Sequence, residues 1–94
     1  MKILINTTFG GYFGGFALSP EVESRLPADM PEPEDSIAYR SHPALIAAVE
    51  EIGLERAAAR FAELKIVEVP DGIDCYIHDY DGSETVHETH RVWS

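Results

Sequence analysis

The sequence predicts a small α+β domain, in which an antiparallel or mixed sheet carries two or three helices on one face and ends in a C-terminal β-hairpin. Two apolar runs of strand length lie far apart, at 2–8 and 64–69, with helical patterns between them. Asp81-Gly82 then separates two further strand patterns, and Asp-Gly is typical of a two-residue hairpin turn. All 94 residues are expected to form a single domain.

The N-terminal elements are a strand and a short helix. The continuous apolar run 3–5 indicates that the strand over 2–8 is buried on both faces. Ser19 is a favourable N-cap and Pro20 suits the first helical position, so a helix is expected over 20–26.

An acidic, proline-rich stretch over 27–36 follows this helix. Pro27 discourages continuation of the helix, and the stretch contains almost nothing to bury. We expect a mobile surface loop here and then a short strand over 36–40.

Two helices are predicted next, over 43–52 and 54–63, with Gly53 ending the first. The apolar residues at helical spacing are Leu45, Ala48, Val49 and Ile52 in the first helix, and Leu54, Ala57, Ala58 and Phe61 in the second. Ile46 falls outside this stripe and is expected at the surface, as a subunit contact or as an isolated exposed residue.

The predicted hairpin joins strands over 73–80 and 83–89. With Asp81-Gly82 as the loop, Tyr80 pairs with Ser83, and alternation then divides the side chains between two faces. The inward set is Ile73, Cys75, Ile77 and Val86, and the outward set is Tyr76, His78, Tyr80 and His87. The outward face is aromatic and polar, which suits a ligand or another subunit.

The composition limits the kinds of molecule that the protein is expected to bind. The net charge is -10, from 17 acidic and 7 basic residues, which opposes binding to nucleic acid because such binding neutralises phosphates. The acidic surface either keeps the protein soluble or imitates nucleic acid toward a basic protein. The single cysteine fits a reducing cytoplasm, and no segment is long and apolar enough to span a membrane. A chain this small has a marginal core, which favours a homo-oligomer.

A glycine-aromatic segment between the first strand and the first helix contains two Gly-Gly pairs, at 10–11 and 14–15. It fits neither a phosphate-binding P-loop nor a dinucleotide fingerprint. Two interpretations stay open, a tight turn with its aromatic rings in the core or a cradle that presents Tyr12, Phe13 and Phe16 to a planar or phosphorylated ligand.

No pattern indicates an enzyme or a metal protein. The four histidines and Cys75 lack the spacing of a metal site, and no nucleophile motif is present, so we expect no cofactor and no catalysis. The scarce arginines are more informative, because a guanidinium can grip phosphate in two places. Arg25, Arg40 and Arg91 are candidates for such contacts, with salt bridges on an acidic surface as the ordinary alternative.

Several segments carry a resemblance to a known family, namely I-N-x-x-F-G-G near the start, R-S-H-P-A-L-I-A-A-V-E-E-I-G, R-F-A-E-L-K-I-V-E-V-P-D-G-I and H-D-Y-D-G-S-E-T-V-H-E-T-H-R-V-W. They resemble small phage-encoded proteins, a group that includes the anti-Thoeris sponge proteins. The resemblance spans most of the chain except 27–35. It implies an oligomer in the host cytoplasm during infection, which binds a cyclic ADP-ribose-type signal or a cyclic oligonucleotide without cleaving it.

The resemblance also implies a pocket near subunit boundaries, with arginines and an aromatic ring around the nucleotide. The positions that match in kind are Arg25, Arg91, Phe61 and the loop around 12–16. Two departures stand out, the additional segment 12–15 and His42, which occupies a place where an acidic helix cap is expected. The alternatives are an acidic inhibitor of a host defence protein and a hydrolase of a cyclic nucleotide.

Overall fold

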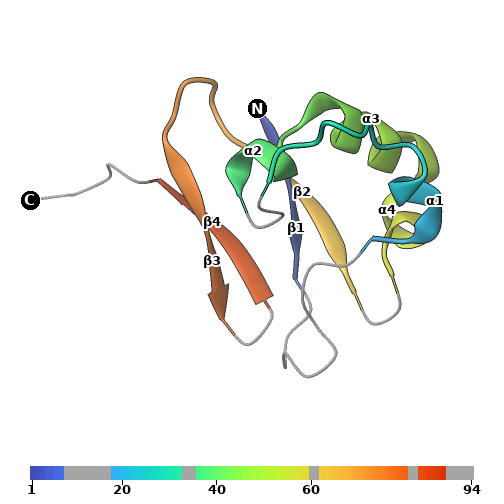
Figure 1. Cartoon of the computed structure of the whole chain (residues 1–94). Coiled ribbons are helices and arrows are strands. Elements are labelled where there is room, and N and C mark those ends of the chain that lie inside the picture. Colours follow the sequence, from blue (N-terminus) through green and yellow to red (C-terminus); the bar gives the residue numbers. More distant parts are fainter. Residues whose placement is uncertain (8–17, 33–35, 60–61, 81–82, 89–94) are drawn as a thin grey trace, which may run out of the picture.

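The computed structural model describes residues 1–7, 18–32, 36–59, 62–80 and 83–88. In chain order the elements are β1 (Lys2–Asn6), α1 (Pro20–Glu23), α2 (Ile37–Arg40), α3 (Pro43–Ile52), α4 (Leu54–Ala57), β2 (Leu64–Glu68), β3 (Cys75–Tyr80) and β4 (Ser83–Glu88). The α+β class and the C-terminal hairpin are therefore confirmed (Figure 1).

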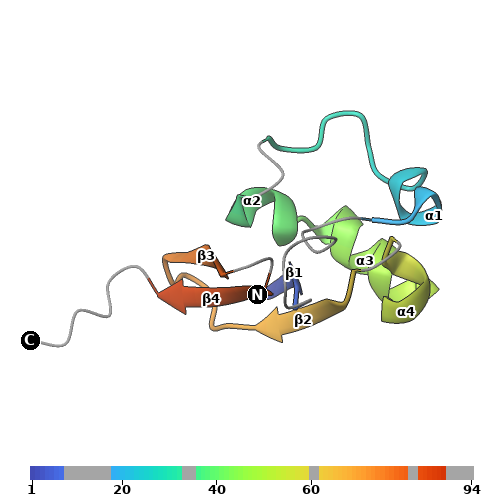
Figure 2. The same ribbon diagram turned by 90° about the horizontal axis from the view of Figure 1, so that it is seen from below.

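Strands β1 and β2 form an antiparallel pair in which Lys2 lies opposite Glu68 and Asn6 opposite Leu64. Helices α2 and α3 lie over one face of this pair (Figure 2). Residues 3–6 are all buried, so β1 is covered on both faces, as its continuous apolar run predicts.

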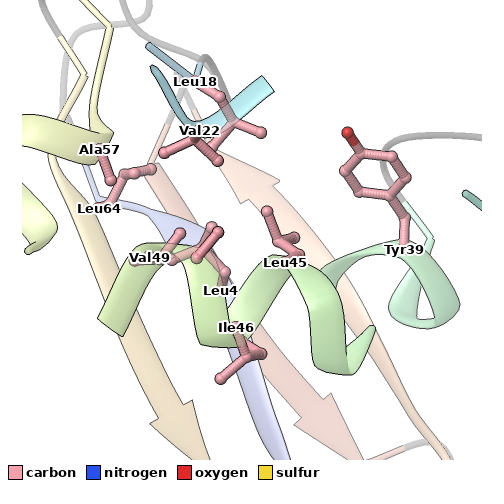
Figure 3. Close-up of a cluster of buried hydrophobic side chains, with 10 residues drawn as sticks. Leu4, Leu18, Val22, Tyr39, Leu45, Ile46, Val49, Ala57 and Leu64 are labelled. Atoms are coloured by element: carbon pink, nitrogen blue, oxygen red, sulfur yellow. The ribbon is translucent and has the colours of Figure 1, made fainter. Parts of the chain in front are cut away.

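The hydrophobic core lies between β1, β2 and the helices (Figure 3). Its buried members are Leu4, Leu18, Val22, Tyr39, Leu45, Ile46, Ala48, Val49, Ala57 and Leu64. The expectation that Ile46 lies at the surface is wrong, because this residue is only 7% exposed. The buried stripe of α3 is wider than the Leu45–Val49 spacing indicated, since α3 is packed on more than one side.

The prediction of a short strand over 36–40 is also wrong, because Ile37–Arg40 form α2 and Ser36 is its N-cap. The Ser36 hydroxyl accepts a hydrogen bond from the Tyr39 N–H at 3.1 Å, which satisfies one of the free N–H groups of the first turn. The turn places Tyr39 and Arg40 side by side in the interior, where an extended strand would have sent them to opposite faces.

Both neighbouring helices are shorter than predicted. Helix α1 ends at Glu23, before the expected Leu26, and α4 ends at Ala57, although its pattern extends to 63. Ala58 adopts an extended conformation and forms an antiparallel bridge with Leu18. This pairing takes the backbone groups that a longer α4 would use, so tertiary contact overrides the helical pattern.

The hairpin has the predicted register, with Tyr80 opposite Ser83 and Ile77 opposite Val86. The loop dipeptide itself lies outside the described residues. In place of one continuous sheet, the described strands form two separate pairs, β1–β2 and β3–β4. Their separation leaves one edge of β1 without a strand partner in the described part of the chain.

Within the described residues, no helix has both the length and the apolar character needed to cross a membrane.

Candidate functional site

A groove of about 660 Å³ opens between α4 and the start of β2, and its volume is in the range of small-molecule sites. Its lining residues are Thr7, Leu54, Glu55, Ala58, Ala62, Glu63, Leu64 and Lys65. Leu54 is 41% exposed, which is unusual for a large apolar side chain in this protein. The groove therefore offers an apolar wall to a ligand, next to polar groups.

The wall nearest β1 is fixed by hydrogen bonds between backbone and side chains. The Thr7 N–H donates to the Glu63 carbonyl at 2.7 Å, and the Glu63 N–H donates to the Asn6 side-chain oxygen at 2.9 Å. Asn6 is fully buried, so its amide holds the start of β2 in place from inside. This side of the groove is thus preformed.

The charges around the groove do not favour an anion by themselves. Two carboxylates, Glu55 and Glu63, line it together with the ammonium group of Lys65. Lys65 is exposed, and no ion pair with another described residue neutralises it. A phosphorylated ligand would need Lys65 and at least one further cation.

Most of the predicted ligand-binding residues lie outside the described residues, namely Tyr12, Phe13, Phe16, Phe61 and Arg91. Their neighbours in sequence are nevertheless informative. Thr7 directly precedes the glycine-aromatic segment, and Ala62 directly follows Phe61. Both Thr7 and Ala62 line the groove.

The structure does not bring Arg25 and Arg40 together. Arg25 is exposed and pairs with Glu51 at 2.9 Å, near the end of α3. Arg40 belongs to α2, at the opposite end of α3 (Figures 1 and 2), and its side chain is only 2% exposed. Neither residue lines the groove, so the convergence of arginines that a nucleotide site requires is not formed by this pair.

Arg40 instead forms a bidentate ion pair with Glu84 of β4. Its two terminal nitrogens donate to the two carboxylate oxygens at 2.7 and 2.8 Å, and the Glu84 side chain is 5% exposed. Such a fork-to-fork arrangement combines charge with a fixed geometry. With its guanidinium engaged inside the protein, Arg40 has a structural role here.

This ion pair also contacts the edge of β1 that faces away from β2. Met1 exchanges backbone hydrogen bonds with Val69, and the Thr7 N–H donates to the Glu63 carbonyl, so the even-numbered residues of β1 direct their backbone groups to the edge away from β2. The Leu4 carbonyl accepts from Arg40 at 3.1 Å, and the Asn6 N–H donates to Glu84 at 2.7 Å. The side chains of Arg40 and Glu84 thus form hydrogen bonds with backbone groups that would otherwise bond to a third strand.

The outward face of the hairpin carries a row of rings. Tyr76 and His87 are stacked with centroids 5.5 Å apart, and His78 lies 5.3 Å from His87. The Thr85 hydroxyl is 2.8 Å from the His87 Nε2 atom. These side chains are exposed, which agrees with the predicted outward set for the residues whose side chains are described.

The inward face of the hairpin is only partly covered. Cys75, Ile77 and Val86 are all of intermediate exposure, and burial raises the pKa of the Cys75 thiol, helped by the nearby charges of Asp74 and Glu88. A raised pKa disfavours the reactive thiolate. Among the described residues, no group of three or more His, Cys, Asp and Glu side chains is placed to hold a metal ion.

Sequence reasoning missed Glu84, Asn6 and Lys65. Glu84 could have been found, because the predicted register places it on the same face as Val86, where an acidic side chain needs a buried cation. Lys65 follows Leu64 in the predicted strand, and nothing in its local pattern distinguishes it from an ordinary exposed lysine.

Comparisons with protein families, with curated proteins and with solved structures found no match for this chain.

Proposed function

We propose that the protein is a binding protein that sequesters a small nucleotide signal, of the cyclic ADP-ribose or cyclic oligonucleotide type, without cleaving it. The observation that supports this best is the groove between α4 and β2. It has the volume of a small-molecule site, an exposed apolar wall at Leu54 and a preformed edge at Thr7 and Glu63.

The aromatic partners in this proposal come from the two segments that adjoin groove residues in the sequence. Thr7 and Ala62 connect it to the glycine-aromatic segment and to Phe61, respectively. A nucleobase needs flat rings, and its phosphates need cations. Lys65 supplies one cation in the proposed site, and Arg91 remains the candidate for another.

The direct test is calorimetric titration of the whole chain with cyclic ADP-ribose isomers, cyclic di- and trinucleotides and their linear counterparts. Mass analysis of the recovered ligand separates the two kinds of activity, because a sequestering protein returns its ligand intact and a hydrolase does not. Binding with intact recovery of one cyclic compound supports the proposal. Absence of binding across the panel, or release of a cleaved product, contradicts it.

A matched pair of variants locates the site. Lys65→Gln and Arg25→Gln each remove one positive charge from an exposed side chain. If the groove is the site, Lys65→Gln weakens binding by about tenfold, the loss expected for one charge-assisted contact, and Arg25→Gln leaves it nearly unchanged. The reverse result would move the site to the surface between α1 and α3.

One observation favours a second candidate, an acidic inhibitor of a host defence protein. Asp29 and Glu32 are exposed, and no ion pair with another described residue neutralises either. Together with Glu34 and Asp35, which lie outside the described residues, they would form a negative surface for a basic partner. Capture of a protein whose binding falls steeply with salt, and is lost when all four are neutralised, would favour this candidate.

A further inference from the structure

The hairpin β3–β4 contacts the rest of the protein through a buried ion pair, outside the hydrophobic core cluster. None of its described residues belongs to the buried hydrophobic core or to the apolar residues packed against that core. Its inward residues Cys75, Ile77 and Val86 are only partly buried. Among the described residues, hydrophobic burial, the usual dominant attraction, therefore acts on the hairpin only through partly buried side chains.

Charged and polar contacts hold it there. The carboxylate of Glu84 accepts from both terminal nitrogens of Arg40 and from the Asn6 N–H, at 2.7 to 2.8 Å. A buried ion pair adds little net stability, because desolvation offsets the attraction, but it strongly disfavours any arrangement in which one charge loses its partner. Arg40 and the edge of β1 thus form a site for one carboxylate, the Arg40 socket, on the part of the protein outside the hairpin, which we call the body.

The connection between body and hairpin is short, and its start is joined to Met1 by the Val69 backbone hydrogen bonds and by an exposed ion pair from Asp71 to the Met1 amino group. Residues 69–74 join β2 to β3 outside any helix or strand, and they include the exposed Gly72 with a positive φ of 82°. Six residues can span about 20 Å when extended. A short hinge, a self-contained hairpin and a socket with one specific occupant are the features of an element that two copies of a chain can exchange.

We infer that the hairpin is an exchangeable arm, so that Glu84 of one copy can occupy the Arg40 socket of a second copy in a domain-swapped dimer. The contacts between hairpin and body are kept in the exchanged form, since the same residues meet across two chains. The occupant of the socket is then a second copy of this chain, and the exchange is independent of any bound nucleotide.

The test uses two complementary variants, Arg40→Glu and Glu84→Arg. Each one alone places like charges in the socket and is expected to lower the urea midpoint of unfolding. In a 1:1 mixture refolded together, the hairpin of the Arg40→Glu chain restores the native pair on the body of the Glu84→Arg chain. The inference predicts a shift of the midpoint toward wild type and a 1:1 complex by native mass spectrometry.

A mixture that unfolds as the sum of its two components, with no mixed complex, would overturn the inference. The matched control is the exposed pair Arg56 and Glu21, whose charge-reversed variants are expected to show no rescue on mixing. A second variant keeps the native ion pair and deletes Asp71 and Gly72, which shortens the connection to four residues and is expected to disfavour closure of the hairpin onto its own body. Exchange predicts a folded dimer, whereas a folded monomer or an unfolded chain argues against it.

Discussion

Arg40 and Glu84 lie 44 positions apart in sequence and form a buried, bidentate ion pair that joins α2 to β4. Arg40 also donates to the Leu4 carbonyl, and Glu84 accepts from the Asn6 N–H, both at the edge of β1 that faces away from β2. An unpaired backbone group in the interior costs free energy comparable to a lost hydrogen bond. The ion pair therefore explains how two separate strand pairs lie side by side without a shared ladder.

Removing one partner of this pair should be far more costly than removing both. Glu84→Gln removes the bidentate carboxylate partner of the buried Arg40 charge, and we expect a loss of about 3–5 kcal/mol in the free energy of unfolding. The double variant Arg40→Met with Glu84→Leu removes both charges and should recover much of that loss. Urea unfolding followed by circular dichroism measures each value.

The exposed pair of Arg56 and Glu21 provides the control. Its nitrogen and oxygen are 2.9 Å apart, similar to the buried pair, but the Arg56 side chain is 71% exposed. Arg56→Met should change the free energy of unfolding by less than about 1 kcal/mol, because solvent screens the pair. Equal losses at Glu84 and Arg56 would show that burial does not decide the strength of these contacts.

Local sequence signals predicted those elements that depend on neighbouring residues. The Asp81-Gly82 dipeptide gave the register of the hairpin, and Pro43 with Gly53 gave the bounds of α3. The prediction of a strand over 36–40 was wrong because Ser36 can cap a helix. Only the hydrogen bond that its hydroxyl accepts from the Tyr39 N–H decides between a strand and a helix here. Long-range pairing shortened α4 through the bridge from Leu18 to Ala58.

The candidate site was harder to predict for the same reason. The groove brings Thr7, Leu54 and Lys65 together from three separate parts of the chain, and no local pattern relates them. Arg40 was predicted as a ligand contact, with a salt bridge as the alternative, and its partner Glu84 lies in the hairpin, beyond any local spacing rule. Sequence reasoning identified residues with informative chemistry, and the fold determined which of them meet.

The two serine caps provide a matched comparison. The Ser36 hydroxyl accepts from the Tyr39 N–H, whereas the Ser19 hydroxyl is buried with no hydrogen-bond partner among the described residues. Ser36→Ala should cost about 0.5–2 kcal/mol of stability, because it removes the side-chain cap that accepts from the Tyr39 N–H. Ser19→Ala should be neutral or stabilising, since it removes a buried unpaired polar atom. Thermal or urea unfolding of both variants measures this, and a larger loss at Ser19 would contradict it.

Ile46 distinguishes a core position from a surface contact. The structure buries it to 7% exposure, whereas Leu54 remains 41% exposed. Ile46→Ala should therefore lower the free energy of unfolding by about 2–5 kcal/mol through lost burial and the cavity left behind. Leu54→Ala should change it by about 0.5 kcal/mol or less, as is usual for surface substitutions. If Ile46→Ala altered only the oligomeric state, the core assignment would be incorrect.

Cys75 should make stability depend on pH in the alkaline range. Burial raises the pKa of its thiol in the folded protein, so the unfolded chain loses this proton first as pH rises. The contribution is fully present below the unfolded pKa and is lost as pH rises through the folded pKa. Urea unfolding between pH 7 and 10 should therefore show a steeper decline for wild type than for Cys75→Ser.

The same property predicts slow alkylation of Cys75 in the folded protein. Thiolate is the reacting species, and its fraction at a given pH falls as the pKa rises. The rate of reaction with iodoacetamide should increase with pH around a midpoint higher in the native protein than in urea. Because partial burial also slows access by a constant factor, the midpoint and not the absolute rate decides the outcome. Equal midpoints in the two states would mean that the inward face of the hairpin does not desolvate the thiol.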